Sequence, residues 1–418
     1  MAMQGSKGNI PTVFRCDYEK TMQRLGGSIA NPTPYYELDG ASPLFIAARH
    51  NQLDMVKYTI ACGADINEGH ASGISPLCVA ASHGHEAIVK YLLEKGAEVD
   101  ILVAKKFTPL FMAIMEGRES VIPLLVEAGA DIERTTGYNL TSLHFAVSYG
   151  HESIVQYLLS KGANIKALTD NGETALDVAI ARGHEKIVRC LVEAGADVEA
   201  VTATNSTPLI EAIQHGYTQI ITYLLEKGAN PERGRYYASP LYYAAKKGNV
   251  DAVKCLIAHG ANIDGVGDPL FTPLAAACFH GKKHVVEYLV EHKADIHKKC
   301  RFFKSSLVHM ATSMGHIDIV KYLLDHGADI SIVDAKGRTP LALAKEREHT
   351  EIVAYLERQL STVNALTNAS QAGEGGNLPL HMAELAGNAD IIRMLSPVNQ
   401  SLGLQSGSSL TATPPHTP

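Results

Sequence analysis

The sequence predicts an all-α solenoid in which helix-turn-helix repeats stack side by side, with β-turn or hairpin tips between them. Three landmarks predict it, because they recur in phase at steps of 32 to 34 residues. Two of these landmarks are glycines, one in a Gly-Ala element such as Gly63-Ala64 and one at mid-repeat, such as Gly84. A fixed period of this length indicates a repeat architecture rather than separate globular domains. The third landmark opens each repeat and falls at Ser42, Ser75, Thr108, Thr141, Thr174, Thr207, Ser239, Thr272, Ser306 and Thr339.

The second repeat shows why each repeat forms two helices. Ser75 is a good N-cap, and Pro76 suits the first helical position, where the missing amide has no partner. This helix should end at Gly84, where a left-handed residue is needed. Neither helix can bury its apolar stripe alone, so each repeat must stack on the next. The second helix is closed by Gly96, and its stripe is formed by Ile88, Val89, Leu92 and Leu93.

In period and landmarks the chain resembles the ankyrin repeat family, whose repeat is a β-turn followed by two antiparallel helices. The resemblance covers residues 40–360 as ten regular repeats, and a detached eleventh covers 378–395. It implies that the chain binds protein partners on a concave side formed by the turn tips and the first helices. It also implies that a histidine of each Thr-Pro-Leu-His motif ties neighbouring turns together, and that position holds His144, His309 and His381.

The segments outside the regular repeats are short. Residues 1–39 are expected to form an N-terminal extension that caps the first repeat, with a short helix near residues 17–25. Residues 361–377 are predicted to be a linker, and residues 396–418, which lack charged side chains, a disordered tail. No stretch is long and apolar enough to span a bilayer, and seven Cys without a CxxC pair are typical of a reducing compartment. We therefore expect a monomeric cytoplasmic protein, or alternatively one that a bacterium secretes into a host cytosol.

Motifs for catalysis are not evident in the sequence. There is no phosphate-binding glycine loop and no zinc-protease motif. His280 and His284 have the spacing of a metal-ligating pair, but a mid-repeat glycine separates them and no third ligand follows. Cys78 with His83, and Cys278 with His280, could act as nucleophile and base, yet neither pair has an orienting third residue. The sequence predicts a protein without enzymatic activity, cofactor or metal, and leaves a cryptic Cys/His hydrolase as an alternative.

Charge is distributed unevenly along the chain. The 37 Lys and Arg and 44 Asp and Glu give a net charge of −7. Residues 230–310 carry 12 basic and 7 acidic residues, a net charge of +5, which leaves −12 for the remainder. Exposed aromatic residues and Arg dominate the energetics of protein interfaces. We therefore expect the strongest partner-binding zone near repeats seven to nine, comprising Arg235, Tyr236, Tyr237, Lys246, Lys247, Phe271, Phe279, His280, Arg301, Phe302, Phe303 and Met314.

A secondary zone is expected near repeats three and four, comprising Lys105, Phe107, Met115, Tyr138 and Tyr149. The basic zone favours an acidic protein partner through complementary charge. A scaffold or adaptor function follows, and a bacterial effector acting through the same repeats is an alternative. A further alternative is an anion-binding protein whose basic zone takes nucleic acid or acidic lipid, although the negative net charge argues against nucleic acid.

Overall fold

The computed structural model of the chain describes residues 41–70, 72–103, 107–235, 238–265, 272–298 and 305–371. Within these ranges the regular elements are helices and there is no β-sheet, as predicted. Two isolated bridges, Val103 with Phe107 and Arg235 with Ala238, form hairpin tips. The predicted extension 1–39, eleventh repeat 378–395 and tail 396–418 lie outside the described residues. The chain divides into two compact units, Met1–Glu211 and Ala212–Pro418, and the division falls within α12 (Pro208–His215).

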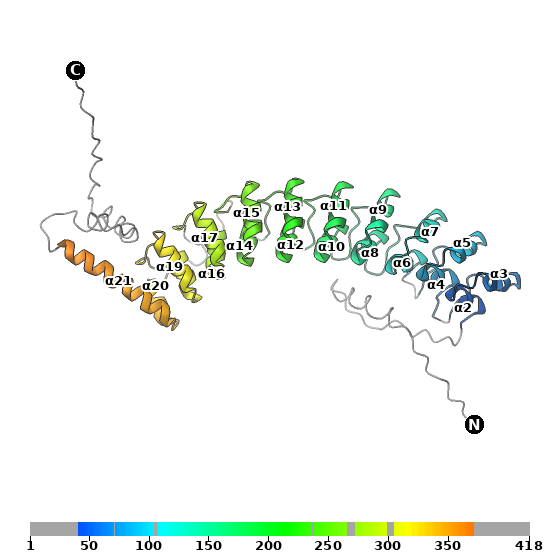
Figure 1. Cartoon of the computed structure of the whole chain (residues 1–418), viewed down its shortest axis with the longest axis horizontal. Helices are drawn as coiled ribbons and strands as arrows, with labels where there is room; N and C mark the ends of the chain where they lie inside the picture. The colour runs from blue at the N-terminus through cyan, green and yellow to red at the C-terminus, as the bar shows by residue number, and fades with distance from the viewer. Residues whose placement is uncertain are drawn as a thin grey trace, which may run out of the picture. The chain divides into compact units, whose positions relative to one another are not determined.

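Unit 1 consists of helical hairpins in which a first helix is followed by a second helix (Figure 1). First helices pack on first helices in the order α2, α4, α6, α8 and α10, and α3, α5 and α7 form a row of second helices. The helices are α2 (Pro43–Arg49), α3 (Leu53–Ala61), α4 (Pro76–His83), α5 (Glu86–Glu94), α6 (Pro109–Met115), α7 (Ile122–Glu127), α8 (Ser142–Tyr149), α9 (Glu152–Ser160), α10 (Ala175–Arg182) and α11 (Glu185–Glu193).

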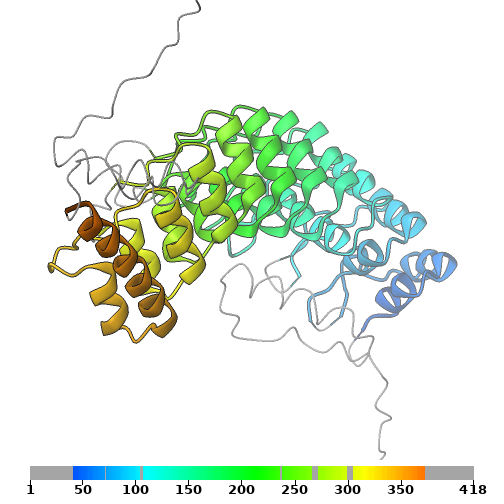
Figure 2. The ribbon, with the colours of Figure 1, turned by 60° about the vertical axis from the view of Figure 1, so that its left-hand side comes forward.

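Unit 2 repeats the same arrangement, and its two rows of helices are visible in Figure 2. The first helices α14, α16, α18 and α20 form one row, and the second helices α13, α15, α17, α19 and α21 form the other. The helices are α13 (Thr218–Glu226), α14 (Pro240–Lys247), α15 (Val250–Ala258), α16 (Pro273–Phe279), α17 (Lys283–Glu291), α18 (Leu307–Ser313), α19 (Ile317–Asp325), α20 (Pro340–Glu346) and α21 (Thr350–Gln371). Helix α21 extends into the predicted linker 361–377, because that segment has neither Gly nor Pro before Gly373.

The local signals of the second repeat act as predicted. The side chain of Ser75 accepts a hydrogen bond from the amide of Cys78 at 3.1 Å, and Pro76 begins the helix. Gly84 ends it with a left-handed backbone, at a φ of 73°. In α5, Ile88, Val89 and Leu92 are buried, whereas Leu93 is half-buried. The capping and stripe predictions are therefore confirmed for this repeat.

Five described non-glycine residues hold a left-handed backbone, namely Asn51, Asn139, Asn205, Lys293 and Glu348. The last two are charged residues in place of a glycine. Lys293 replaces the glycine of a Gly-Ala element and has a φ of 71°. Glu348 replaces a mid-repeat glycine and has a φ of 59°. The helical hairpins keep their geometry at Lys293 and Glu348, so each of these residues bears the strain of a left-handed backbone.

In several repeats a histidine just after the mid-repeat turn position ties its repeat to the preceding one. Each acts as a donor to a carbonyl oxygen near the end of the preceding first helix. His85, His316 and His349 use Nε2 to bond the carbonyl oxygens of Arg49, Phe279 and Ser313 at 3.0, 3.3 and 3.3 Å. These bonds satisfy helix-terminal acceptors that have no partner within the helix. The stacked first helices are thereby held in a fixed register.

Candidate binding surface

Five described members of the predicted zone in unit 2 lie at the C-terminal ends of three adjacent first helices. Lys246 and Lys247 occupy the last turn of α14. Phe279 ends α16 with His280 as its C-cap, and Met314 is the C-cap of α18. Because α14 packs on α16 and α16 packs on α18, these helix ends lie next to one another. The structure therefore brings these residues together on one side of unit 2.

Most of these side chains are open to solvent. Lys246, Lys247 and His280 are exposed, and Met314 is 45% exposed, which is high for a large apolar side chain. Phe279 is half-buried, and its ring meets the ring of His280 edge-on with centroids 5.2 Å apart. Exposed apolar and cationic groups thus lie beside each other at the ends of these helices.

Positive charge accumulates around His280. Burial lowers the pKa of the His280 imidazole, and the charges of Lys246, Lys282 and His316 lower it further. Lys282 lies in the turn after α16, but its side chain reaches the end of α14. Gly248 is the C-cap of α14, and a Cβ on Gly248 would stand 2.7 Å from the Lys282 Cδ. His316, which follows the mid-repeat glycine of the next repeat, also acts on His280.

The one remaining described member of this zone lies at a turn tip. Arg235 is at the tip before α14, where its amide donates to the carbonyl of Ala238 at 3.0 Å. The Tyr243 hydroxyl donates to the Arg235 carbonyl at 3.2 Å, which fixes this tip to α14. Six predicted members lie outside the described residues: Tyr236, Tyr237, Phe271, Arg301, Phe302 and Phe303.

In the secondary zone of unit 1, two predicted residues belong to an aromatic cluster. Phe107 meets Phe111 and Phe145 edge-on, with centroids 6.5 and 6.2 Å apart. Tyr149 stacks between Phe145 and His151, with centroids 6.4 and 6.0 Å apart. Aromatic pairs in these geometries stabilise packing beyond the area they bury. Phe107 and Tyr149 therefore have a packing role in addition to any role at the surface.

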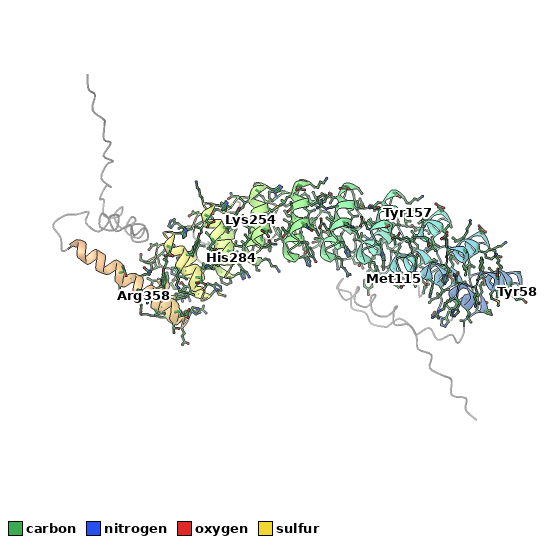
Figure 3. The ribbon with its side chains drawn as sticks, viewed as in Figure 1. Tyr58, Met115, Tyr157, Lys254, His284 and Arg358 are labelled. Carbon is green, nitrogen blue, oxygen red and sulfur yellow. The ribbon has the colours of Figure 1, made fainter. Side chains whose placement is uncertain are left out.

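Two other members of the secondary zone lie at a helix end and at a turn tip. Met115 ends α6 and is half-buried, and Tyr138 is half-buried at a turn tip. Figure 3 shows Met115 on the side of the first helices, whereas Tyr157 lies on the side of the second helices. Lys105 lies outside the described residues.

The two Cys/His pairs lack the features of a nucleophile and its base. Cys78 and Cys278 are fully buried, and burial raises the pKa of both thiols, that of Cys78 to about 11. A reactive cysteine needs an accessible thiolate, which a raised pKa opposes. The Nδ1 of His83 bonds the carbonyl of Val79 at 2.9 Å. These positions fit packing roles.

Metal ligation and membrane insertion find no support in the described part of the chain. No cluster of three or more His, Cys, Asp or Glu side chains in it could hold a metal ion. His284 Nδ1 instead lies 3.3 Å from the carboxylate of Glu287. Of the helices in the described ranges, none has the length and apolar character to cross a bilayer.

Comparison with protein families gives a match across most of the chain. The matching family model is described as ankyrin repeats in three copies. Its matches begin at residue 17 and end at residue 406, with a gap between 300 and 307. The matched segments are 17–104, 44–136, 100–169, 143–235, 232–300 and 307–406.

Individual relatives match over shorter lengths. The chain is 32% identical over 174 residues to the putative palmitoyltransferase ZDHHC13 of Danio rerio, covering 41% of this chain and 26% of the relative. It is 30% identical over 117 residues to ankyrin repeat and SOCS box protein 11 of Homo sapiens, covering 28% of this chain and 35% of the relative. The chain thus spans well under two thirds of the length of these curated relatives.

Two solved ankyrin repeat domains are similar in structure. The human ASB11 domain is 31% identical, with a TM-score of 0.47, and covers 53% of this chain and 99% of its own. The Bcl-3 domain is 29% identical, with a TM-score of 0.48 and the same two coverages.

Proposed function

The chain belongs to the ankyrin repeat family, and we propose that it is a scaffold or adaptor that binds a protein partner through the ends of its first helices near repeats seven to nine. Ankyrin repeats are typically protein–protein interaction domains. The proposal adds where on this chain the partner binds, and it includes neither enzymatic activity nor a cofactor. It also assigns a monomeric state and a cytoplasmic location.

One observation carries this proposal: consecutive repeats have the same backbone frame but present different side chains at equivalent exposed positions. Lys247, His280 and Met314 occupy equivalent positions before the mid-repeat glycines of three consecutive repeats. Their frame is uniform, because Ser239, Thr272 and Ser306 each cap the first helix of their repeat with a side-chain hydrogen bond. A rigid scaffold with exposed cationic and apolar side chains provides the anchors that interfaces use. The predicted tip residues, including Phe302 and Phe303, belong to the same proposal.

A matched pair of variants tests this location. The binding variant combines Lys246→Ala, His280→Ala and Met314→Ala. The control variant combines Lys254→Ala, His284→Ala and Lys321→Ala on the second helices of the same unit. Quantitative affinity purification from cytosol should recover a specific protein with the wild type and the control variant. Recovery should fall about tenfold or more with the binding variant, the loss expected when central contacts are removed.

Two outcomes would contradict this location. Equal recovery with the wild type and the binding variant would show that the first-helix ends take no part in binding. A loss confined to the control variant would place the partner on the second helices. Circular dichroism of each variant at equal concentration establishes that the helices are intact.

A further inference from the structure

Four basic side chains from three consecutive repeats converge in unit 2. His280 caps α16, and the charges of Lys246 from α14, Lys282 from the following turn and His316 from the turn after α18 act on it. The His316 ring lies across Gly281, where a Cβ would stand 2.6 Å from its Cε1. Each of the three neighbours thus reaches His280 from a different element.

Within the described ranges, this cluster has no carboxylate to balance it. Lys246 and Lys282 form no ion pair within the described ranges, and no described carboxylate shifts the pKa of His280. The carboxylate of Glu287 on α17 is engaged elsewhere, 3.6 Å from Lys283 Nζ and 3.3 Å from His284 Nδ1. Like charges that are held together repel one another, and they attract an anion from outside the cluster.

Apolar groups flank the cluster. Met314 is 45% exposed on the α18 side, and the half-buried Phe279 ring lies against His280. A free inorganic anion would use the charges alone, whereas an acidic stretch of protein could also place an apolar side chain on Met314. The combination favours a polypeptide over a long polyanion, which the net charge of −7 would repel.

We propose that the cluster formed by Lys246, His280, Lys282 and His316 binds the carboxylates of an acidic segment of the protein partner, with Met314 contacting an apolar residue of that segment. This inference rests on the proposed function and specifies the chemistry of the partner. Complementary charge would set its specificity and accelerate its association.

The cluster also makes the binding dependent on pH. Among the described residues, the charged groups that act on His280 are Lys246, Lys282 and His316, all of which oppose its protonation. A bound carboxylate favours the protonated imidazole, so binding takes up a proton. The affinity for an acidic segment should therefore rise as the pH is lowered from neutral, while the glutamates of the segment stay ionised.

Two fluorescein-labelled peptides test the partner chemistry by anisotropy with the full chain. One alternates Glu with Leu and Ala, and the other has Gln in place of every Glu. We expect the Glu peptide to bind about tenfold or more tightly than the Gln peptide, and to lose affinity as salt is added. Its affinity should be higher at a pH of about 5.5 than at about 7.5, because carboxylate binding is coupled to protonation of His280.

Matched variants assign the effect to the cluster. Lys246→Gln with Lys282→Gln should weaken the Glu peptide about tenfold, through loss of two facing charges. Lys254→Gln with Lys321→Gln removes the same charge from the second helices and should change the affinity less than about twofold. His280→Gln should reduce the change with pH, whereas His284→Gln should preserve it in full.

Several results would overturn the inference. Equal affinity for the Glu and Gln peptides would do so, as would equal losses in the two double-lysine variants. Tighter binding of a thymidine oligonucleotide of the same charge would identify a polyanion site instead. If the Glu peptide fails to bind but partner recovery still depends on Lys246, His280 and Met314, only the partner chemistry is wrong. If neither holds, the proposed function fails as well.

Discussion

The Nε2 of His309 donates a hydrogen bond of 2.9 Å to the carbonyl oxygen of Arg338, and so joins two consecutive repeats through a buried side chain. The Nδ1 of the same ring lies 2.8 Å from the Ser306 hydroxyl, which orients it. Arg338 is itself held by the carboxylate of Asp334, 2.7 Å from its Nη2. The histidine thus has the turn-tying role that the family resemblance implies.

His309→Ala should destabilise the full chain. The change removes a buried hydrogen bond and leaves a cavity, so the free energy of unfolding should fall by about 2–3 kcal/mol. Urea unfolding followed by circular dichroism measures it. His326→Ala, at an exposed helix end, should change it by less than about 0.5 kcal/mol. Equal effects of the two variants would contradict the structural role of His309.

Asp177 occupies the position that His144 and His309 hold in their repeats, and it should make stability depend on pH. Its carboxylate is buried and accepts two hydrogen bonds from Thr174, and burial raises its pKa from 3.8 to about 6. The folded state therefore favours the protonated acid. This contribution to stability is complete below the unfolded pKa and is lost as the pH rises through the folded value.

Asp177→Asn removes that titration. We expect the variant to be more stable than the wild type by about 1–3 kcal/mol at neutral pH, with the advantage shrinking toward pH 4. Urea midpoints measured across this range test it. Asp170→Asn, an exposed carboxylate in the preceding turn, serves as the control. An advantage of Asp177→Asn that grows as the pH falls would contradict the sign of the shift.

Lys293→Gly should stabilise unit 2. Lys293 is exposed and has a φ of 71°, a backbone that costs about 1 kcal/mol for a residue with a Cβ. The thermal midpoint should rise. Lys95→Gly, at an exposed helix end with a φ of −89°, should lower it, because glycine there only adds freedom to the unfolded chain. If both changes lower the midpoint, Lys293 carries no relievable strain.

Phe302→Ala with Phe303→Ala tests the turn tips of the proposed surface. The double variant should reduce partner recovery while leaving the thermal midpoint nearly unchanged, because the two rings are expected to face a partner. Differential scanning fluorimetry and affinity purification give the two readouts. A large drop in the midpoint would assign both rings to packing instead.

Much of the fold was predictable because its signals are local and repeated. Ser75, Pro76 and Gly84 act within one helix, through a cap, a fixed φ and a left-handed backbone. A period of about 33 residues then places equivalent residues on neighbouring helices. The proximity of Lys247, His280 and Met314 follows directly from that register.

Contacts that cross between repeats were harder to predict. Phe107 was expected at the surface, yet it packs on Phe145 of the next repeat, a contact that depends on the conformation of a tip. The proximity of His316 to His280 depends on how one ring lies across a glycine, which spacing alone does not specify. Helix α21 likewise continues beyond the repeat pattern, where only the absence of helix-breaking residues indicates it.

Site-specific photocrosslinking tests the location of the partner most directly. Benzoylphenylalanine is placed at Met314 in one full-length chain and at Lys254, on a second helix of the same unit, in another. Irradiation in cytosol should join a protein to the chain labelled at 314 and leave the chain labelled at 254 unmodified. A crosslinked protein from position 254 and none from 314 would contradict binding at the ends of the first helices.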